Sequence, residues 1–187
     1  MDAAGEIVPV DLLVAGEDVE PSLLAAVSTL AHAPRVIGVY RRDDLPHDTR
    51  GATLALWHVA DPGNVGTLVR SAAAFGAAVA LSPGSADPTG PKALRASMGA
   101  LFGVPLVDFD AAPGRRVALV PHGGTPLTEV ELEGDVVFVL GAERTGLPTE
   151  VLDRCDVHAS IPQSDDAESL NVAMAGTIAL YERARRA

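Results

Sequence analysis

Residues 161–175 read IPQSDDAESLNVAMA, and they join the end of an apolar strand to the start of a helix. The strand, predicted over 157–161, stops at Pro162 and is followed by a loop rich in carboxylates. The helix is predicted because apolar residues recur at helical spacing, at Leu170, Met174, Ile178 and Tyr181. Ser169 and Asn171 stand where N-caps usually stand, so capping is the simplest interpretation of both.

A second informative stretch, residues 61–76, reads DPGNVGTLVRSAAAFG and follows a strand predicted over 53–58. It predicts a turn, then a helix from about Asn64 that stops at Gly76. From these residues alone, Asn64 is a helix cap and Arg70 is half of a surface ion pair.

The third stretch, residues 138–148, reads FVLGAERTGLP at the end of a strand predicted over 135–140. Gly141 and Gly146 bracket Glu143. Glycines at a strand exit indicate either a plain tight turn or a close approach of backbone to a ligand.

Strands and helices alternate from residue 53 onward, and apolar runs such as 135–140 are typical of parallel strands covered on both faces. Helix 92–102 and the strands 79–81, 104–107 and 116–120 complete the pattern. The phosphate-binding pattern G-x-G-x-x-G is absent. A ligand is therefore expected beyond the carboxyl ends of the strands, where all three stretches lie.

The opening of the chain, residues 1–50, is predicted to be a separate N-terminal segment before a domain over 51–187. It reads as a strand at 7–14, a helix at 21–30, a strand at 36–40 and a charged linker at 41–50.

Composition limits the class of protein. The lone Cys155 forms no internal disulfide, which fits a cytoplasmic location, and the scattered histidines show no metal-ligand spacing. No apolar run is long enough to cross a membrane. A net charge of -11 argues against binding nucleic acid unless a local basic patch acts despite it. Candidates for that patch are Arg41, Arg42, Arg50, Arg70, Lys92, Arg95 and Arg144.

Together the three stretches resemble, in order and spacing, the three motifs of the SpoU (TrmH) class of SPOUT RNA methyltransferases. The resemblance covers about residues 53–183 and implies an α/β-knot fold with a deep trefoil knot. It implies S-adenosylmethionine-dependent methylation of a ribose 2′-hydroxyl in rRNA or tRNA, by a homodimer. It also suggests that residues 1–50 are the tail of a substrate-binding domain like ribosomal protein L30e. A small elaboration of the catalytic domain is an equal alternative.

The resemblance also assigns roles to individual residues. The reaction centre would be lined by Asn64, Arg70, Glu143, Ser169 and Asn171. The cofactor would be held by Leu140, Gly141, Gly146, Ile161, Leu170, His122 and Gly123. An arginine pKa above about 12 makes Arg70 a better orienting group than a general base.

The sequence departs from the family pattern after Pro162, where Gln163 and Asp165 replace the usual Met and Gly. Acidic residues there could complement a sulfonium or repel RNA. Two alternatives therefore stay open: a non-catalytic relative that binds RNA or S-adenosylmethionine, and a base methyltransferase of the same fold.

Overall fold

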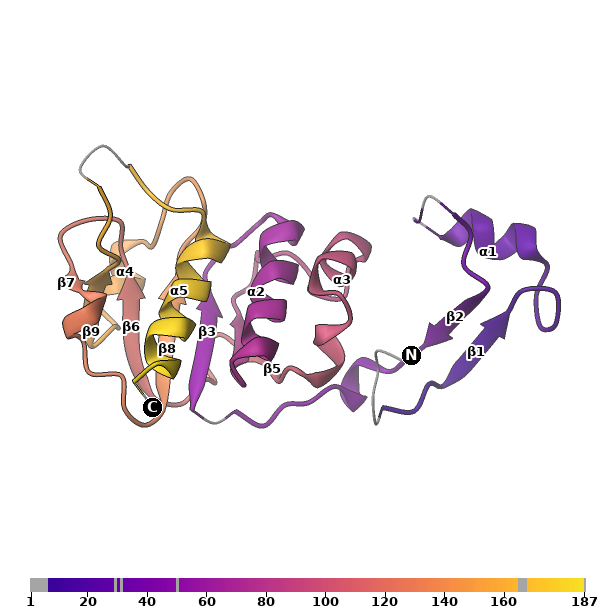
Figure 1. Cartoon of the computed structure of the whole chain (residues 1–187), viewed down its shortest axis with the longest axis horizontal. Helices are drawn as coiled ribbons and strands as arrows, with labels where there is room; N and C mark the ends of the chain where they lie inside the picture. The colour runs from indigo at the N-terminus through magenta and orange to yellow at the C-terminus, as the bar shows by residue number, and fades with distance from the viewer. Residues whose placement is uncertain (1–6, 29, 31, 50, 165–167, 187) are drawn as a thin grey trace. The chain divides into compact units, whose positions relative to one another are not determined.

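The structure is a computed structural model that describes residues 7–28, 30, 32–49, 51–164 and 168–186. The chain divides into two compact units, residues 1–45 and 46–187, and each has its own sheet (Figure 1). Within the described residues, no helix is long and apolar enough to cross a membrane.

The N-terminal unit contains two antiparallel strands and a helix. β1 (Asp11–Val14) pairs with β2 (Val36–Val39), and the turn η1 (Arg42–Asp44) follows. Between the strands in sequence lies α1 (Pro21–Val27), which begins at proline because its missing N–H costs nothing in the first turn. Both β1 and α1 are shorter than predicted, and α1 buries only Leu24.

The second unit is built on a seven-stranded sheet with the order β5-β4-β3-β8-β6-β9-β7. Every pairing within it is parallel, as the buried apolar runs predicted. Its strands are β3 (Ala52–Leu56), β4 (Ala78–Leu81), β5 (Leu106–Asp108), β6 (Arg115–Leu119), β7 (Thr125–Pro126), β8 (Val136–Leu140) and β9 (Val157–Ser160). The sequence did not predict β7, which is two residues long.

Helices cover the sheet unequally. In Figure 1, α5, α2 and α3 lie side by side, and α2 and α5 pack on one face of the sheet. The one-turn helix α4 and the loop after β5 cover the other face, through Val151, Phe109 and Ala112. The helical segments are α2 (Pro62–Ala74), α3 (Pro91–Ser97), η2 (Ala100–Gly103), η3 (Leu127–Glu129), α4 (Thr149–Leu152) and α5 (Val172–Ala184).

The predicted helix over 92–102 is wrong in one respect, because it is broken in the middle. Met98 and Gly99 both take left-handed backbone conformations, with φ of 53° and 84°. This ends α3 and starts the separate 3-10 segment η2. Gly99 was a sequence signal for this break, since glycine after a helix commonly takes the left-handed conformation.

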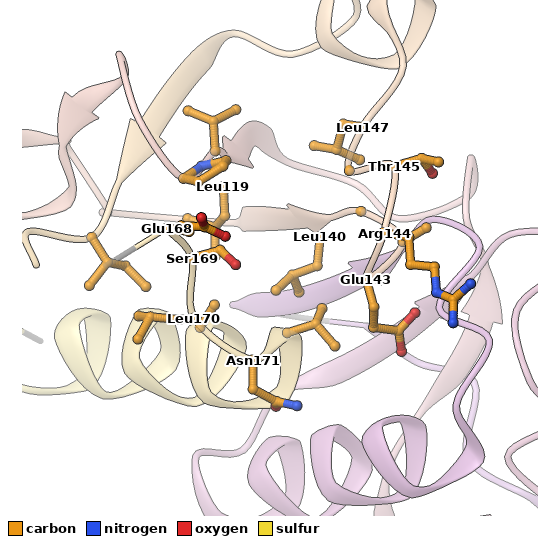
Figure 2. Close-up of a pocket in the computed structure, with 18 of the residues that line it drawn as sticks. Leu119, Leu140, Glu143, Arg144, Thr145, Leu147, Glu168, Ser169, Leu170 and Asn171 are labelled. Carbon is orange, nitrogen blue, oxygen red and sulfur yellow. The ribbon is translucent and has the colours of Figure 1, made fainter. Parts of the chain in front are cut away.

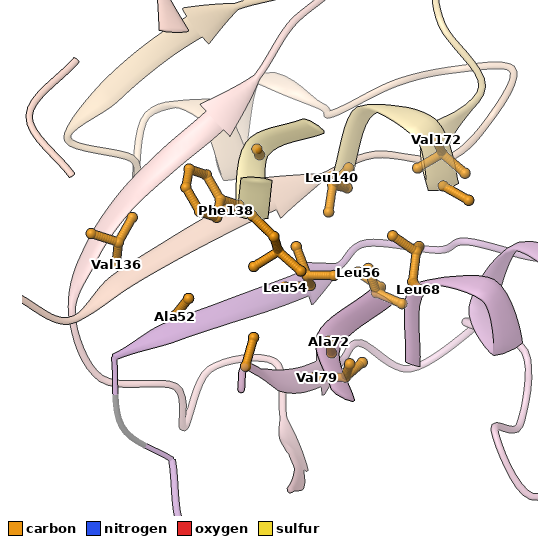
Figure 3. Packing of buried hydrophobic residues seen from close by; sticks show 14 of the residues in the cluster. Ala52, Leu54, Leu56, Leu68, Ala72, Val79, Val136, Phe138, Leu140 and Val172 are labelled. Atoms are coloured by element: carbon orange, nitrogen blue, oxygen red, sulfur yellow. The ribbon is translucent and has the colours of Figure 1, made fainter. Parts of the chain in front are cut away.

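The core lies on both faces of the sheet because side chains alternate along each strand. Leu54 and Leu56 of β3 meet Leu68 of α2 and Phe138 of β8 in the larger cluster (Figure 3). The side chains in between face the smaller cluster, as Ala55 does. Because β3 and β8 are buried on both faces, the loops at their carboxyl ends start from fixed points.

Helix α5 buries the side opposite to its apolar stripe. The apolar positions predicted at helical spacing are exposed by 37% to 58%: Leu170, Met174, Ile178 and Tyr181. The buried side consists of small and apolar residues, including Ala173, Gly176 and Leu180. A Cβ on Gly176 would lie 2.5 Å from Leu68, so its smallness permits close packing of α5 on α2. The exposed stripe does not cover the chain's own sheet.

Candidate active site

The main pocket lies at the carboxyl ends of β6, β8 and β9, the position expected for a ligand of a parallel sheet. It has a volume of about 720 Å³. Figure 2 shows its walls: Leu140 and residues 143–147 on one side and residues 168–171 on the other. Eight of the predicted site residues line it: Leu140, Gly141, Glu143, Gly146, Ile161, Ser169, Leu170 and Asn171.

The loop after β8 closes on itself. The Gly146 N–H donates to the Ala142 carbonyl at 2.9 Å. A Cβ on Gly141 would lie 2.3 Å from the Gly146 carbonyl carbon, so residue 141 must be glycine for the loop to close. Gly146 has a φ of +67° and only open space where its Cβ would be. The loop is therefore a tight turn, and it presents bare backbone to the pocket.

Three predicted catalytic residues from the three motifs are joined by hydrogen bonds. Asn64 Nδ2 donates to Glu143 Oε1 at 2.9 Å, and Asn171 Nδ2 donates to Asn64 Oδ1 at 3.1 Å. Glu143 and Asn171 line the pocket, whereas Asn64 reaches them from the first turn of α2. We call Asn64, Glu143 and Asn171 the amide–carboxylate chain.

Asn171 uses both ends of its side-chain amide. Its Oδ1 caps α5 by accepting from the N–H groups of Ala173 at 2.9 Å and Met174 at 3.3 Å. Its Nδ2 bonds Asn64. The capping predicted for Asn171 is confirmed, and the same cap turns its amide nitrogen toward the amide–carboxylate chain.

The Glu143 carboxylate is held in its charged form. Burial raises its pKa, but hydrogen bonds from the Asn64 side chain and from backbone N–H groups, including those of Asp61 and Ala60, outweigh burial. The net pKa lies below its ordinary value of 4.5. Glu143 is therefore a charged acceptor near neutral pH, and its oxygens are already occupied by N–H donors.

Sequence reasoning missed two residues that support the amide–carboxylate chain. Asp61 caps α2 by accepting from the Asn64 N–H at 3.0 Å, and Lys92 Nζ donates to Asp61 at 2.9 Å. The Lys92 side chain, followed by the Asn64 N–H, lowers the pKa of Asp61. The cap was readable, because Asp followed by Pro62 at the first helical position is a common helix start. The cap that the sequence suggested for Asn64 belongs to Asp61 instead.

Arg70 is the predicted catalytic residue that the structure leaves apart. It is exposed on α2 and makes no hydrogen bond or ion pair with any residue that the structure describes. The surface ion pair considered as its alternative is thus not formed within the described part of the chain.

His122 and Gly123 were predicted to hold the cofactor, yet neither lines the pocket, although Pro121 does. The His122 ring nitrogen Nε2 lies 3.0 Å from the Glu168 carbonyl oxygen. Gln163 Nε2 donates to the Pro121 carbonyl at 3.2 Å. These contacts tie the exit of β6 to the loop after β9. Asp165 and its two following neighbours lie outside the described residues.

No group of three or more His, Cys, Asp or Glu side chains that could hold a metal is present in the part of the chain that the structure describes.

Comparison with known proteins identifies the family. Residues 51–181 match the model of the SpoU rRNA Methylase family. The chain is 32% identical to an uncharacterized tRNA/rRNA methyltransferase of Synechocystis sp., covering 93% of this chain and 67% of that protein. It is 35% identical to the 23S rRNA (guanosine(2553)-2'-O)-methyltransferase RlmP of Bacillus subtilis, covering 66% and 54%. The chain thus spans about half to two thirds of these curated relatives.

Solved structures agree. The SpoU methyltransferase AviRb of Streptomyces viridochromogenes, in complex with AdoMet, matches with a TM-score of 0.76 and 28% identity, over 89% of this chain and 71% of that one. An AdoMet-bound rRNA methyltransferase of Sinorhizobium meliloti matches with a TM-score of 0.77 and 30% identity, over 88% and 69%. The chain belongs to the SpoU rRNA Methylase family.

Proposed function

We propose that this protein transfers a methyl group from S-adenosylmethionine to a ribose 2′-hydroxyl of rRNA or tRNA. The observation that carries the proposal is the amide–carboxylate chain, which joins the three motifs at the wall of the pocket. Family membership supports it, as do the relatives named as rRNA 2′-O-methyltransferases and the AdoMet in two similar structures.

The pocket fits the proposed methyl donor. Its volume of about 720 Å³ lies within the range of about 300–1,000 Å³ that is common for small-molecule sites. Leucine side chains supply apolar walls, and Gly146 leaves room at its open side. When bound, S-adenosylmethionine supplies a methyl group on a positively charged sulfur. Leu140, Gly141, Ile161 and Leu170 would hold it.

The chain's own residues would position the attacking hydroxyl. Each of Asn64 and Asn171 has a second N–H on its amide nitrogen, beyond the one used within the amide–carboxylate chain. Those N–H groups can donate to the 2′-oxygen as negative charge develops on it. Glu143 is already occupied by donors, so its role is to orient Asn64. In the proposed transfer, the 2′-oxygen would form a bond to the methyl carbon as the methyl carbon–sulfur bond breaks. S-adenosylhomocysteine would be the leaving group, and the hydroxyl proton would pass to water.

We also infer that the active form is a homodimer. The exposed stripe on α5, formed by Met174, Ile178 and Tyr181, is an apolar face that nothing in its own chain covers among the described residues. Arg70 is exposed and unpaired within the described chain, so it is free to enter the site of a second copy. Light scattering at micromolar concentration tests the dimer, and Met174→Asp with Ile178→Asp should give a monomer.

Three further proposals follow from membership of the family. We infer that the loops around the pocket form the family's trefoil knot. The β-α-β arrangement of the first unit is compatible with the tail of an L30e-like domain, within a segment we place at residues 1–50 before a methyltransferase domain at 51–187. A protein that modifies rRNA or tRNA is expected to work in the cytoplasm.

Transfer of labelled methyl from S-adenosylmethionine to RNA, followed by alkaline hydrolysis, tests the proposed reaction. A 2′-O-methyl group blocks cleavage of the adjacent linkage, so label should remain in resistant dinucleotides. Label in mononucleotides would indicate base methylation. Saturable cofactor binding without transfer would support the non-catalytic alternative.

A further inference from the structure

The charge of this chain poses a problem for its proposed substrate. With a net charge of -11, the protein as a whole repels RNA, so binding depends on a few local cations. Those cations must lie where the target ribose enters, because the 2′-hydroxyl has to reach the pocket. The basic side chains suggested by the sequence can now be compared one by one.

Most of these basic residues are engaged or lie elsewhere. Lys92 is held by Asp61 at 2.9 Å, which offsets its charge. Arg95 has an interaction of its own. Arg41 and Arg42 belong to the N-terminal unit, and Arg50 lies outside the described residues. Arg70 is exposed and has no partner among the described residues, but it does not line the pocket.

Arg144 differs from all of these. It is exposed, lines the pocket, and makes no hydrogen bond or ion pair with any residue that the structure describes. Its neighbour Glu143 forms no ion pair with it, and the Glu143 oxygens instead accept from Asn64, Ala60 and Asp61. In Figure 2 the Glu143 and Arg144 side chains point to the same side of the pocket, away from Glu168 and Ser169.

We propose that Arg144 binds a phosphate that flanks the target ribose. A ribose presented at the amide–carboxylate chain brings its own phosphates with it, and the 3′-phosphate is carried by C3′, the carbon next to the one that bears the 2′-hydroxyl. Arg144 follows Glu143 directly in sequence, so it lies beside the amide–carboxylate chain. The planar guanidinium of Arg144 can donate to two phosphate oxygens at once. Arg144 is thus a positioning residue for RNA, and this role rests on the proposed function.

Binding of a short fluorescein-labelled, mixed-sequence RNA, measured by anisotropy without cofactor over a series of salt concentrations, tests the role of Arg144. Arg144→Ala should weaken affinity at low salt about fivefold to tenfold and reduce the slope of log K against log[salt] by about 0.7 to 1. Arg144→Lys should keep the slope but recover only part of the affinity, because a point charge lacks the fork. Affinity for S-adenosylhomocysteine, measured by calorimetry, should not change in either variant.

Arg115→Ala is the matched control. It removes the same charge at the amino end of β6, away from the carboxyl ends of the strands that form the pocket, where Arg115 pairs with Glu131. It should leave RNA affinity and the salt slope as in the wild type.

Three outcomes would overturn the inference. Suppose that Arg144→Ala and the wild type have equal RNA affinity and equal salt slope, and that the wild type methylates RNA. This result would exclude Arg144 as a phosphate-binding residue but would leave the proposed function intact. Loss of S-adenosylhomocysteine affinity in Arg144→Ala would show that Arg144 serves the cofactor's carboxylate instead. A wild type that neither binds nor methylates RNA would end both proposals together.

Discussion

Arg70→Ala is expected to abolish most methyl transfer while leaving the protein folded. Arg70 is exposed and has no partner among the described residues, so its removal should change the free energy of unfolding by no more than about 0.5 kcal/mol. The buried side of α2, formed by residues such as Val65, Leu68 and Val69, is untouched. We expect Arg70 to orient the 2′-hydroxyl and to donate to its oxygen as negative charge develops, and loss of one such donor typically slows turnover about 100- to 1,000-fold. Arg70→Lys should fail nearly as badly, because it lacks the planar fork.

Mixing two inactive variants tests whether Arg70 acts in the site of a second copy. In a symmetric dimer of Arg70→Ala with Asn171→Ala, one of the two sites has both residues intact. Random exchange makes half of all dimers mixed, so about a quarter of wild-type activity should return. Single-turnover transfer of labelled methyl to RNA measures this, and calorimetry of S-adenosylmethionine on Arg70→Ala should match the wild type. Full activity in Arg70→Ala would refute its catalytic role. Absence of recovery after proven subunit exchange would refute the shared site.

Three more predictions concern the pocket wall. Asn171→Asp should keep the cap of α5 but lose the donor to Asn64, so circular dichroism should match the wild type while turnover falls at least tenfold; equal turnover would contradict the role of the amide. Because the folded-state pKa of Glu143 is lowered, its stabilising effect should be full above pH 4.5 and be lost as pH falls through the lower folded value. Thermal unfolding against pH, compared with Glu143→Gln, measures this, and parallel curves would contradict it. Gly141→Ala should cost about 1–3 kcal/mol in chemical denaturation, because its Cβ would lie 2.3 Å from the Gly146 backbone. Gly146→Ala, which meets only open space, should cost less, about 1–2 kcal/mol for its left-handed backbone.

The sequence predicted the elements best where their signals were local and strong. The buried face of α2 and the strand β8 have clear apolar patterns, and both lie within two residues of the predicted bounds. The break at Met98 was missed because the apolar spacing continues across it, although Gly99 marked the place. Strand β7 is too short to show any period.

The candidate site also has parts that the sequence predicted and parts that it could not. The motifs placed Asn64, Glu143 and Asn171 together, but motif spacing cannot show which atoms meet, since those bonds join residues about 80 to 110 positions apart. The sequence also left open whether the apolar stripe on α5 covers the chain's own sheet or lies at a dimer interface. Periodicity identifies a stripe but not what it faces, and the opposite side of α5 is buried by small residues such as Ala173 and Gly176.

The strand order of the sheet bears on how the chain reaches its native state. β3 pairs early with β4, but its other neighbour is β8, with Leu54 opposite Phe138. At synthesis rates of about 5–20 residues per second, the ribosome delivers β8 roughly 4 to 17 seconds after β3. During that interval the edge of β3 that pairs with β8 has no partner. The nascent chain should therefore bind chaperones most strongly between the emergence of β3 and that of β8.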